Sequence, residues 1–288
     1  MACNVSKDPS STDFTILKFD LSETKDSLSF VKWQDENLLK VLEIQVDTLF
    51  TIDSIPIGHL VYSDRDYKVY ANCFGEFGGS LMFQDRKNKD SIYYLESVCP
   101  LQIERRNCTY FIVSSLPHVD GFSKIILLDS PKNLILVPKD SLAKNWKGIM
   151  FPDPNPQVMY SATANQGKVL LDTNGILVNL LFDYDGKNYL VYSDYPYTLL
   201  GRLNYQSIEV LDTLLDFSIR RDIEVLNDQI NGFKHFHIDY KNTSIIRNIK
   251  EEKIGKGDIY IQDDKIVLGF NNEKRSTPVE PKNSWRKK

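Results

Sequence analysis

Phe74-Gly-Glu-Phe-Gly-Gly-Ser-Leu-Met-Phe-Gln-Asp85 opens the stretch that decides the fold, which continues to Pro131. Within it, short runs of aromatic and branched residues are separated by Gly, Pro, Asn or Asp. These runs lie at 81–83, 92–95, 110–113 and 125–128. Runs of this length between turn residues are typical of antiparallel strands joined by short connections. The stretch therefore predicts a four-strand meander, which we take as the template for the chain.

A repeated pentapeptide extends this template. Leu-Val-Tyr-Ser-Asp occurs at 60–64 and again at 190–194, and Tyr67 and Tyr197 follow the two copies at the same distance. The copies lie about 130 residues apart, roughly three times the ~40–45 residues of a four-stranded propeller blade. The spacing predicts a mainly β chain built as an antiparallel β-propeller-like array of about five or six blades.

One segment departs from the strand pattern, because its apolar residues recur at steps of three and four, as on one face of a helix. These residues are Ile208, Leu211, Leu215, Ile219, Ile223, Leu226 and Ile230. Ser207 before them and Gly232 after them are of the types that cap helices. The pattern predicts one peripheral or inserted helix near 207–230.

The remaining segments give the expected domain organisation. We expect a flexible N-terminal tether over 1–13, a single mainly β domain over 14–270 and a disordered polar tail over 271–288. Near the start of the domain, segments 29–33 and 38–46 are expected to be strands, and the alternation at Val41, Ile44 and Val46 in the second indicates one solvated face. The prolines at 152–156 favour an extended loop inside the domain.

Composition excludes some classes of function. The 288 residues include 35 basic and 39 acidic side chains, which gives a formal net charge of −4. Because the two signs are interspersed, we expect no nucleic-acid partner, since non-specific binding needs a broad basic face. No apolar run approaches the ~20 residues of a membrane-spanning helix.

The first residues bear on location. Met-Ala-Cys-Asn resembles the end of a bacterial lipoprotein signal, in which a small residue precedes the lipidated cysteine and a polar tether follows. On this interpretation Cys3 is the lipid attachment, and the protein is a lipoprotein of the bacterial cell envelope, in the periplasm or at the outer membrane. The alternative is a cytoplasmic protein, structural or regulatory, with a chance cysteine at this position.

Three further cysteines, Cys73, Cys99 and Cys108, cannot all pair within one molecule. Cys99 and Cys108 flank a turn, so one alternative is a bridge between them across a hairpin. Reduced, buried cysteines are the simpler interpretation. None of the cysteine and histidine spacings typical of zinc occurs.

His235 and His237 are the residues that a metal would use. They are two positions apart, so both side chains share a face if this segment is a strand, and Asp239 would add a third ligand. Three alternate residues on one strand spread too far for one ion to reach easily. A solvated or hydrogen-bonded strand face is the simpler interpretation, and we expect no cofactor.

Familiar catalytic motifs are absent from the sequence, including the nucleophile elbow, the phosphate-binding loop and the dinucleotide fingerprint. The glycines at 75–79 lead into a strand and are explained by a tight turn or bulge. In the turn at 117–121, His118 and Asp120 have the residue types of a base and its orienting carboxylate. Asp120-Gly121 also has the composition of a plain turn.

These observations favour a non-enzymatic binding or interaction module whose loops meet a protein or glycan partner. The alternative is a carbohydrate-active hydrolase with paired carboxylates at the mouth of a propeller. Its candidate catalytic residues are Glu76, Asp85, His118, Asp120 and Asp194. A hydrolase would need two of the carboxylates ~5–10 Å apart in a concave pocket, whereas a binding module would not.

Overall fold

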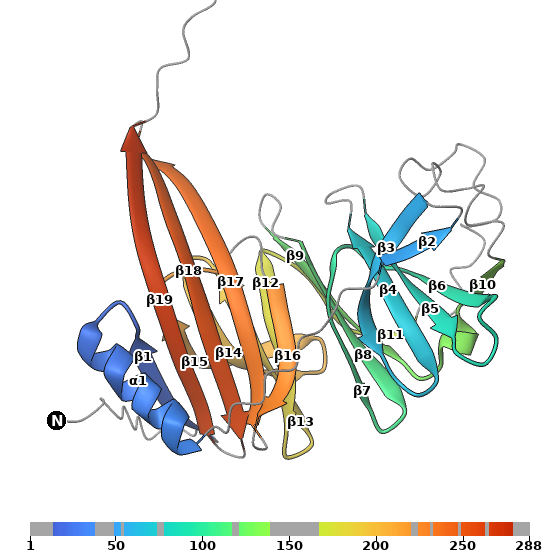
Figure 1. Cartoon of the computed structure of the whole chain (residues 1–288), viewed down its shortest axis with the longest axis horizontal. Coiled ribbons are helices and arrows are strands. Elements are labelled where there is room, and N and C mark those ends of the chain that lie inside the picture. The colour runs from blue at the N-terminus through green and yellow to red at the C-terminus, as the bar shows by residue number, and fades with distance from the viewer. Residues whose placement is uncertain are drawn as a thin grey trace, which may run out of the picture. The chain divides into compact units, whose positions relative to one another are not determined.

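The structure, a computed structural model, describes residues 14–37, 49–52, 55–73, 78–116, 121–138, 167–219, 224–230, 233–246, 249–262 and 265–278. Over these ranges the chain is mainly β, with four sheets in which most neighbouring strands are antiparallel (Figure 1). The predicted mainly β class is confirmed. The propeller stays a prediction, because the described residues form four sheets, whereas the sequence predicted about five or six blades.

The chain divides into two compact units. Unit 1 contains Met1–Leu42, Pro196–Thr198 and Leu211–Lys288, and unit 2 contains Glu43–Tyr195 and Leu199–Val210. Each unit is described by itself below. The single domain expected over 14–270 stays a prediction.

Unit 2 contains the template stretch in two sheets. The β4 sheet has the strand order β10-β6-β5-β4-β3-β2, with β2 (Leu49–Ile52), β3 (Ile55–Ser63), β4 (Tyr67–Cys73), β5 (Gly79–Asp85), β6 (Ser91–Glu96) and β10 (Ile135–Pro138). The β8 sheet has the order β11-β9-β8-β7, with β7 (Pro100–Arg106), β8 (Thr109–Leu116), β9 (Phe122–Leu128) and β11 (Lys168–Asn174). A 3-10 turn, η2 (Pro131–Asn133), precedes β10. The four apolar runs of the template are strands, as predicted, and lie in β5, β6, β8 and β9. The predicted four-strand meander is wrong, because β7 intervenes and the runs are divided between two sheets.

The third sheet, the β13 sheet, has the order β12-β13-β14-β15. Its strands are β12 (Ile176–Tyr184), β13 (Lys187–Asp194), β14 (Tyr197–Asn204) and β15 (Ser207–Leu215). The second copy of the repeated pentapeptide ends β13, and Tyr197 begins β14. The first copy likewise ends β3 and continues into the turn before Tyr67, which begins β4. The repeat therefore marks two hairpins with the same local sequence and the same position of the turn.

The β8 sheet is buried on both faces. Ile112 and Ile126 belong to an apolar cluster that also contains Val69 of the β4 sheet, while Val113 and Ile125 belong to another cluster with residues of the β13 sheet. Because neighbouring residues of a strand point to opposite faces, each strand supplies both cores. A strand covered on both faces reads as a continuous apolar run, which explains Tyr-Phe-Ile-Val at 110–113.

Polar side chains align the layers of unit 2. The side-chain amide of Gln102 in β7 donates to the Leu181 carbonyl at 2.8 Å, and its carbonyl accepts from the Leu181 N–H at 2.9 Å. Gln102 is buried, so these two bonds satisfy polar groups that lie away from water. The amide thus makes the same two backbone hydrogen bonds that a neighbouring strand would make, and it joins β7 to β12.

Unit 1 contains the fourth sheet, the β18 sheet, with the order β1-β19-β18-β17-β16. Its strands are β1 (Thr15–Asp20), β16 (Glu224–Ile230), β17 (Phe233–Ile246), β18 (Ile249–Gln262) and β19 (Lys265–Pro278). β1 pairs with β19 in parallel, although the two strands come from opposite ends of the described chain. The other pairs are antiparallel.

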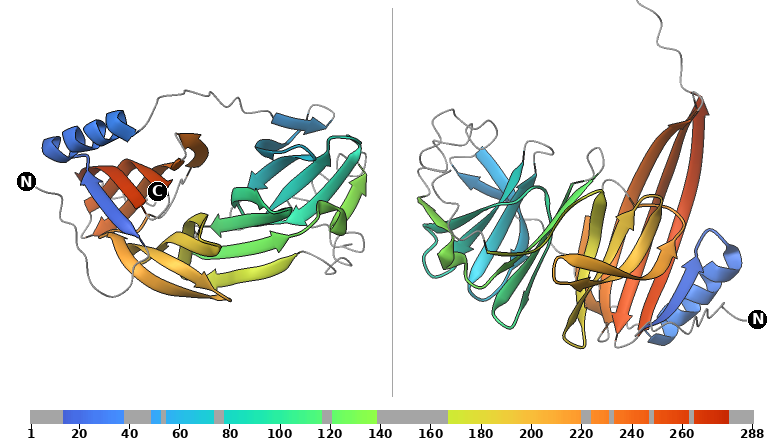
Figure 2. Two further views of the ribbon diagram at one scale, coloured as in Figure 1. Left: turned by 90° about the horizontal axis from the view of Figure 1, so that it is seen from below. Right: turned by 180° about the vertical axis from the view of Figure 1, so that it is seen from behind.

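A helix, α1 (Thr24–Asn37), lies alongside the β18 sheet in both views of Figure 2. Phe30 is buried against Phe19, Tyr260 and Val267. Gly269 lies under this ring, and a Cβ atom at that position would be 2.6 Å from Cζ of Phe30. The glycine therefore provides the space that the aromatic ring fills.

The predicted strand at 29–33 is wrong, because these residues lie in α1. Phe30 and Trp33 are three residues apart, and both contact Tyr260 on the sheet. Asp26 in the first turn favours the helix through its charge. The predicted segment was too short to distinguish this helical spacing from the alternation of a strand.

The predicted helix near 207–230 is also wrong. Ser207–Leu215 is strand β15 and Glu224–Ile230 is strand β16. Phe217, which lies off the predicted helical stripe, is buried, and its carbonyl accepts a hydrogen bond from the Thr198 hydroxyl at 2.7 Å. Pairing with neighbouring strands has overridden the helical spacing of the apolar residues.

Residues 271–278, which the sequence analysis placed in a disordered tail, continue β19 and pair with β18 up to Pro278. The rest of the expected tail, the expected tether and the expected strand at 38–46 lie outside the described residues. Within the described ranges, no helix is long and apolar enough to cross a membrane.

Candidate functional site

Several predicted site residues lie outside the described residues, namely Cys3, Glu76, His118 and Asp120. Asp85 is described, and its Oδ1 accepts hydrogen bonds from the Lys87 N–H at 2.7 Å and the Asn88 N–H at 3.3 Å. It therefore stabilises the turn after β5. Asp194 is exposed at the end of β13.

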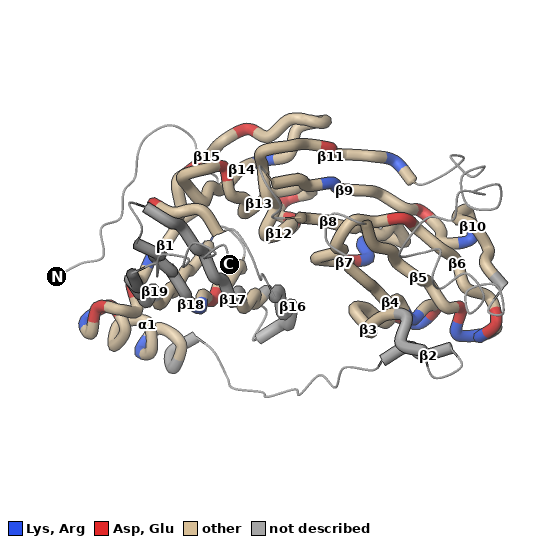
Figure 3. Tube along the Cα trace, turned by 90° about the horizontal axis from the view of Figure 1, so that it is seen from above, with Lys and Arg blue, Asp and Glu red and all other residues tan. Residues whose placement is uncertain are grey.

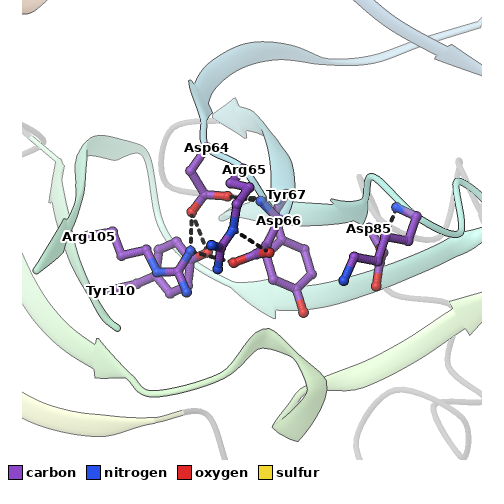
Figure 4. Close-up of polar contacts among 8 residues, drawn as sticks. Asp64, Arg65, Asp66, Tyr67, Asp85, Arg105 and Tyr110 are labelled. Carbon is purple, nitrogen blue, oxygen red and sulfur yellow. Dashed lines mark hydrogen bonds and ion pairs between the residues drawn. The ribbon is translucent and has the colours of Figure 1, made fainter. Parts of the chain in front are cut away.

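A cluster of charged side chains does form in unit 2, and we call it the Arg105 cluster (Figure 4). Arg105 of β7 donates through Nη1 to Asp64 Oδ2 at 3.0 Å and to Asp66 Oδ2 at 2.8 Å. The Tyr110 hydroxyl of β8 donates to Asp64 Oδ2 at 2.7 Å. The cluster, Asp64, Asp66, Arg105 and Tyr110, thus joins the β3–β4 turn to the β7–β8 hairpin.

Asp64 also organises its own turn. Its Oδ1 accepts from the backbone N–H of Asp66 at 2.7 Å and of Tyr67 at 2.8 Å. An aspartate that bonds to the backbone two and three residues ahead fixes the geometry of a turn. One carboxylate therefore holds the turn and anchors it to the neighbouring sheet.

The side chains of the Arg105 cluster keep one protonation state at neutral pH, because their pKa values are shifted away from it. Burial raises the pKa of Asp64, but hydrogen bonds from Tyr110, from two backbone N–H groups and from Arg105 lower it further than burial raises it. Hydrogen bonds from Arg105 and Arg65 lower the pKa of Asp66. Burial, together with the bond to Asp64, raises the pKa of Tyr110. Both carboxylates are therefore ionised at neutral pH, and neither serves as a proton donor.

The two predicted metal-ligand candidates meet in unit 1. His235 Nε2 and His237 Nδ1 each lie 2.9 Å from Oδ1 of Asp258, which comes from the neighbouring strand β18. The ring of His235 stacks on Tyr260 with a centroid distance of 4.4 Å. Among the described residues, no group of three or more His, Cys, Asp or Glu side chains is arranged to hold a metal ion. The geometry is that of a hydrogen-bonded strand face.

The Asp258 carboxylate between the two histidines predicts how the stability of the protein changes in acid. Burial raises the pKa of Asp258, but hydrogen bonds from His235 and His237 outweigh it, and the pKa falls to about 2. Because this pKa lies below its value in the unfolded chain, the stabilisation is complete above about pH 4 and is lost as pH falls toward 2.

We expect Asp258→Asn to lower the free energy of unfolding by about 2 kcal/mol at neutral pH and by much less near pH 2. Urea denaturation of both proteins at the two pH values measures this difference. A loss of equal size at both pH values would contradict the ionic origin of the effect.

A disulfide joins two sheets of unit 2. Cys73 at the end of β4 is bonded to Cys99 just before β7, with 4.4 Å between their Cα atoms. Cys108 is free and exposed in the β7–β8 turn. The prediction of reduced, buried cysteines is therefore wrong for Cys73 and Cys99, and Cys108 is reduced as predicted but exposed. The alternative bridge between Cys99 and Cys108 is wrong as well.

Two tyrosines project from turns of the β13 sheet. Tyr195 and Tyr205 have 74% and 80% of their surface exposed. They precede and follow β14, so they stand at opposite ends of this strand. No local pattern in the sequence singles out these two residues.

Comparison with known proteins adds nothing to this geometry. No family model, curated protein or solved structure matches the chain. Function is therefore inferred from the site itself.

Proposed function

We propose that the protein is a non-enzymatic binding module that presents turns of its sheets to a protein or glycan partner. The exposure of Tyr195 and Tyr205 carries this proposal. Tyrosine offers a large, rigid contact area and loses little conformational entropy on binding, so it is enriched at recognition surfaces. At the tips of turns these rings add little to the protein's own core.

The electrostatics of the Arg105 cluster support a structural role for its two carboxylates and not a hydrolytic one. A glycosidase needs one carboxyl group with a raised pKa to protonate the leaving group. Asp64 and Asp66 share Arg105, and both have lowered pKa values. Basic and acidic positions are interspersed along the described strands (Figure 3), which fits the proposal that nucleic acid is not the partner.

The sheet order supports a propeller-like scaffold for this module. Strands β12 to β15 follow one another in space as they do in sequence, as do β16 to β19 and β3 to β6. Four-stranded meanders of this kind are the blades of propellers. We propose that the turns between such strands form the binding surface.

The Cys73–Cys99 bond supports a location in the cell envelope. Disulfides persist in oxidising compartments and are rare in the cytosol. The bond therefore favours export over the cytoplasmic alternative.

Binding of the purified chain to glycan and peptide arrays tests the proposed function. We expect the double variant Tyr195→Ser/Tyr205→Ser to lose about tenfold or more in affinity for the ligand found. Val61→Ser, which removes an exposed apolar side chain from β3, is the matched control and should bind as the wild type does. Failure of the wild type to bind either array, or unchanged binding by the double variant, would overturn the proposal.

A further inference from the structure

The turn between β14 and β15 carries an aromatic ring in an unusual backbone conformation. Tyr205 and Gln206 have φ values of 30° and 65°. Turns with two such residues strongly prefer Asn, Asp or Gly, and a bulky side chain at positive φ is uncommon. Strained residues of this kind gather at functional sites. A tyrosine that is strained and also largely exposed indicates a role in binding and not in the stability of the fold.

The ammonium of a lysine lies over the face of this ring. Lys168 Nζ of β11 lies 5.9 Å from the centroid of Tyr205. Gly167 has a φ of +85°, and a Cβ there would lie 2.4 Å from the Leu127 carbonyl oxygen, so the chain passes close to β9 just before Lys168. Lys168 itself is exposed, and it forms no ion pair with any residue that the structure describes.

The other charges of this hairpin compensate each other. Arg202 donates to Glu209 Oε2 from Nε at 3.0 Å and from Nη2 at 2.6 Å, and the Asn204 amide donates to the same oxygen at 2.9 Å. The Arg202 charge is therefore neutralised by its cross-strand partner. Within the part of the chain that the structure describes, the ammonium of Lys168 has no ion-pair partner and contacts the ring of Tyr205.

We propose that Tyr205 and Lys168 form a subsite for an acidic glycan, in which a uronic acid residue stacks on the tyrosine ring and its carboxylate pairs with the Lys168 ammonium. This inference rests on the proposed function and names the ligand class. The C–H face of a sugar ring matches an exposed aromatic ring, and the carboxylate complements the cation. A folded protein partner would need a much larger surface with an apolar centre, of the order of 800 Å² on each side.

Affinity electrophoresis of the full chain in gels containing polygalacturonate, alginate or dextran tests this subsite. We expect the two uronate polymers to retard the protein and neutral dextran to leave its mobility unchanged. Added salt should weaken the retardation, because the carboxylate–ammonium pair is exposed. Tyr205→Ala and Lys168→Gln should each weaken the affinity by about tenfold, and dichroism spectra should show that both variants fold.

Lys132→Gln is the matched control for charge and Leu136→Ala the control for exposed apolar surface; both should bind as the wild type does. Binding of neutral glycans or peptides without uronates would overturn the subsite and leave the proposed function standing. Uronate binding that neither variant weakens would also overturn the subsite. Absence of binding to any glycan or peptide would overturn both.

Discussion

Replacing Cys73 and Cys99 together by serine is expected to lower the free energy of unfolding by roughly 3 kcal/mol. The bond spans a sequence separation of 26 residues, so its loss frees a long loop in the unfolded chain. It also removes the covalent link between the end of β4 and the start of β7. Guanidinium denaturation of the two proteins under oxidising conditions measures the difference.

The control for this experiment is Cys108→Ser. Cys108 is exposed and unbonded, so its replacement should change stability by less than about 0.5 kcal/mol. A reducing agent should destabilise the wild type and leave the double serine variant unchanged. Equal stability of the wild type and the double variant, or two free thiols at positions 73 and 99 in the native protein, would contradict the prediction.

Asp64→Ala is expected to cost about 2–4 kcal/mol, because it removes four hydrogen bonds from one carboxylate. The variant would also leave Arg105 with fewer partners in a site where only 23% of its side chain is exposed. Asp64→Asn should cost less, because an amide oxygen still accepts the bonds of the turn. Chemical denaturation at neutral pH measures both effects.

The repeated pentapeptide supplies a matched control. Asp194 occupies the position of Asp64 in the second copy, but it is exposed at the end of β13. Asp194→Ala should therefore change stability by less than about 0.5 kcal/mol. Similar losses for the two aspartates would show that the turn alone, and not the anchor to Arg105, accounts for the effect at Asp64.

The template stretch predicted the mainly β class because its apolar runs are short and lie between turn residues. All four runs are strands in the structure. The segment 207–230 was misjudged because its apolar residues are spaced as in a helix. The β14–β15 turn and the pairing of β16 with β17 determine its conformation instead. Neither feature can be recognised from the spacing of apolar residues within the segment.

The Arg105 cluster was missed for a different reason. Asp64 and Arg105 are far apart in sequence, and only the packing of two sheets brings them together. The repeat drew attention to Asp64 but gave no sign of its partner. The disulfide was missed in the same way, since Cys73 and Cys99 meet only once the two sheets pack. His235 and His237 were predicted to share a face because a single strand suffices for that inference, but their partner Asp258 comes from another strand.

The β8 sheet has apolar residues on both faces, so polarity alone does not fix how its strands align. If β8 slipped by one position, Ile112 and Val113 would exchange cores, and water would still be excluded from both. In the neighbouring strand β7, Gln102 does fix the alignment on β12, because its side-chain amide both donates to and accepts from the backbone of Leu181. A shift of β7 would leave the donor and the acceptor of this amide buried without hydrogen-bond partners. One side chain therefore disfavours misaligned packing of β7 on β12.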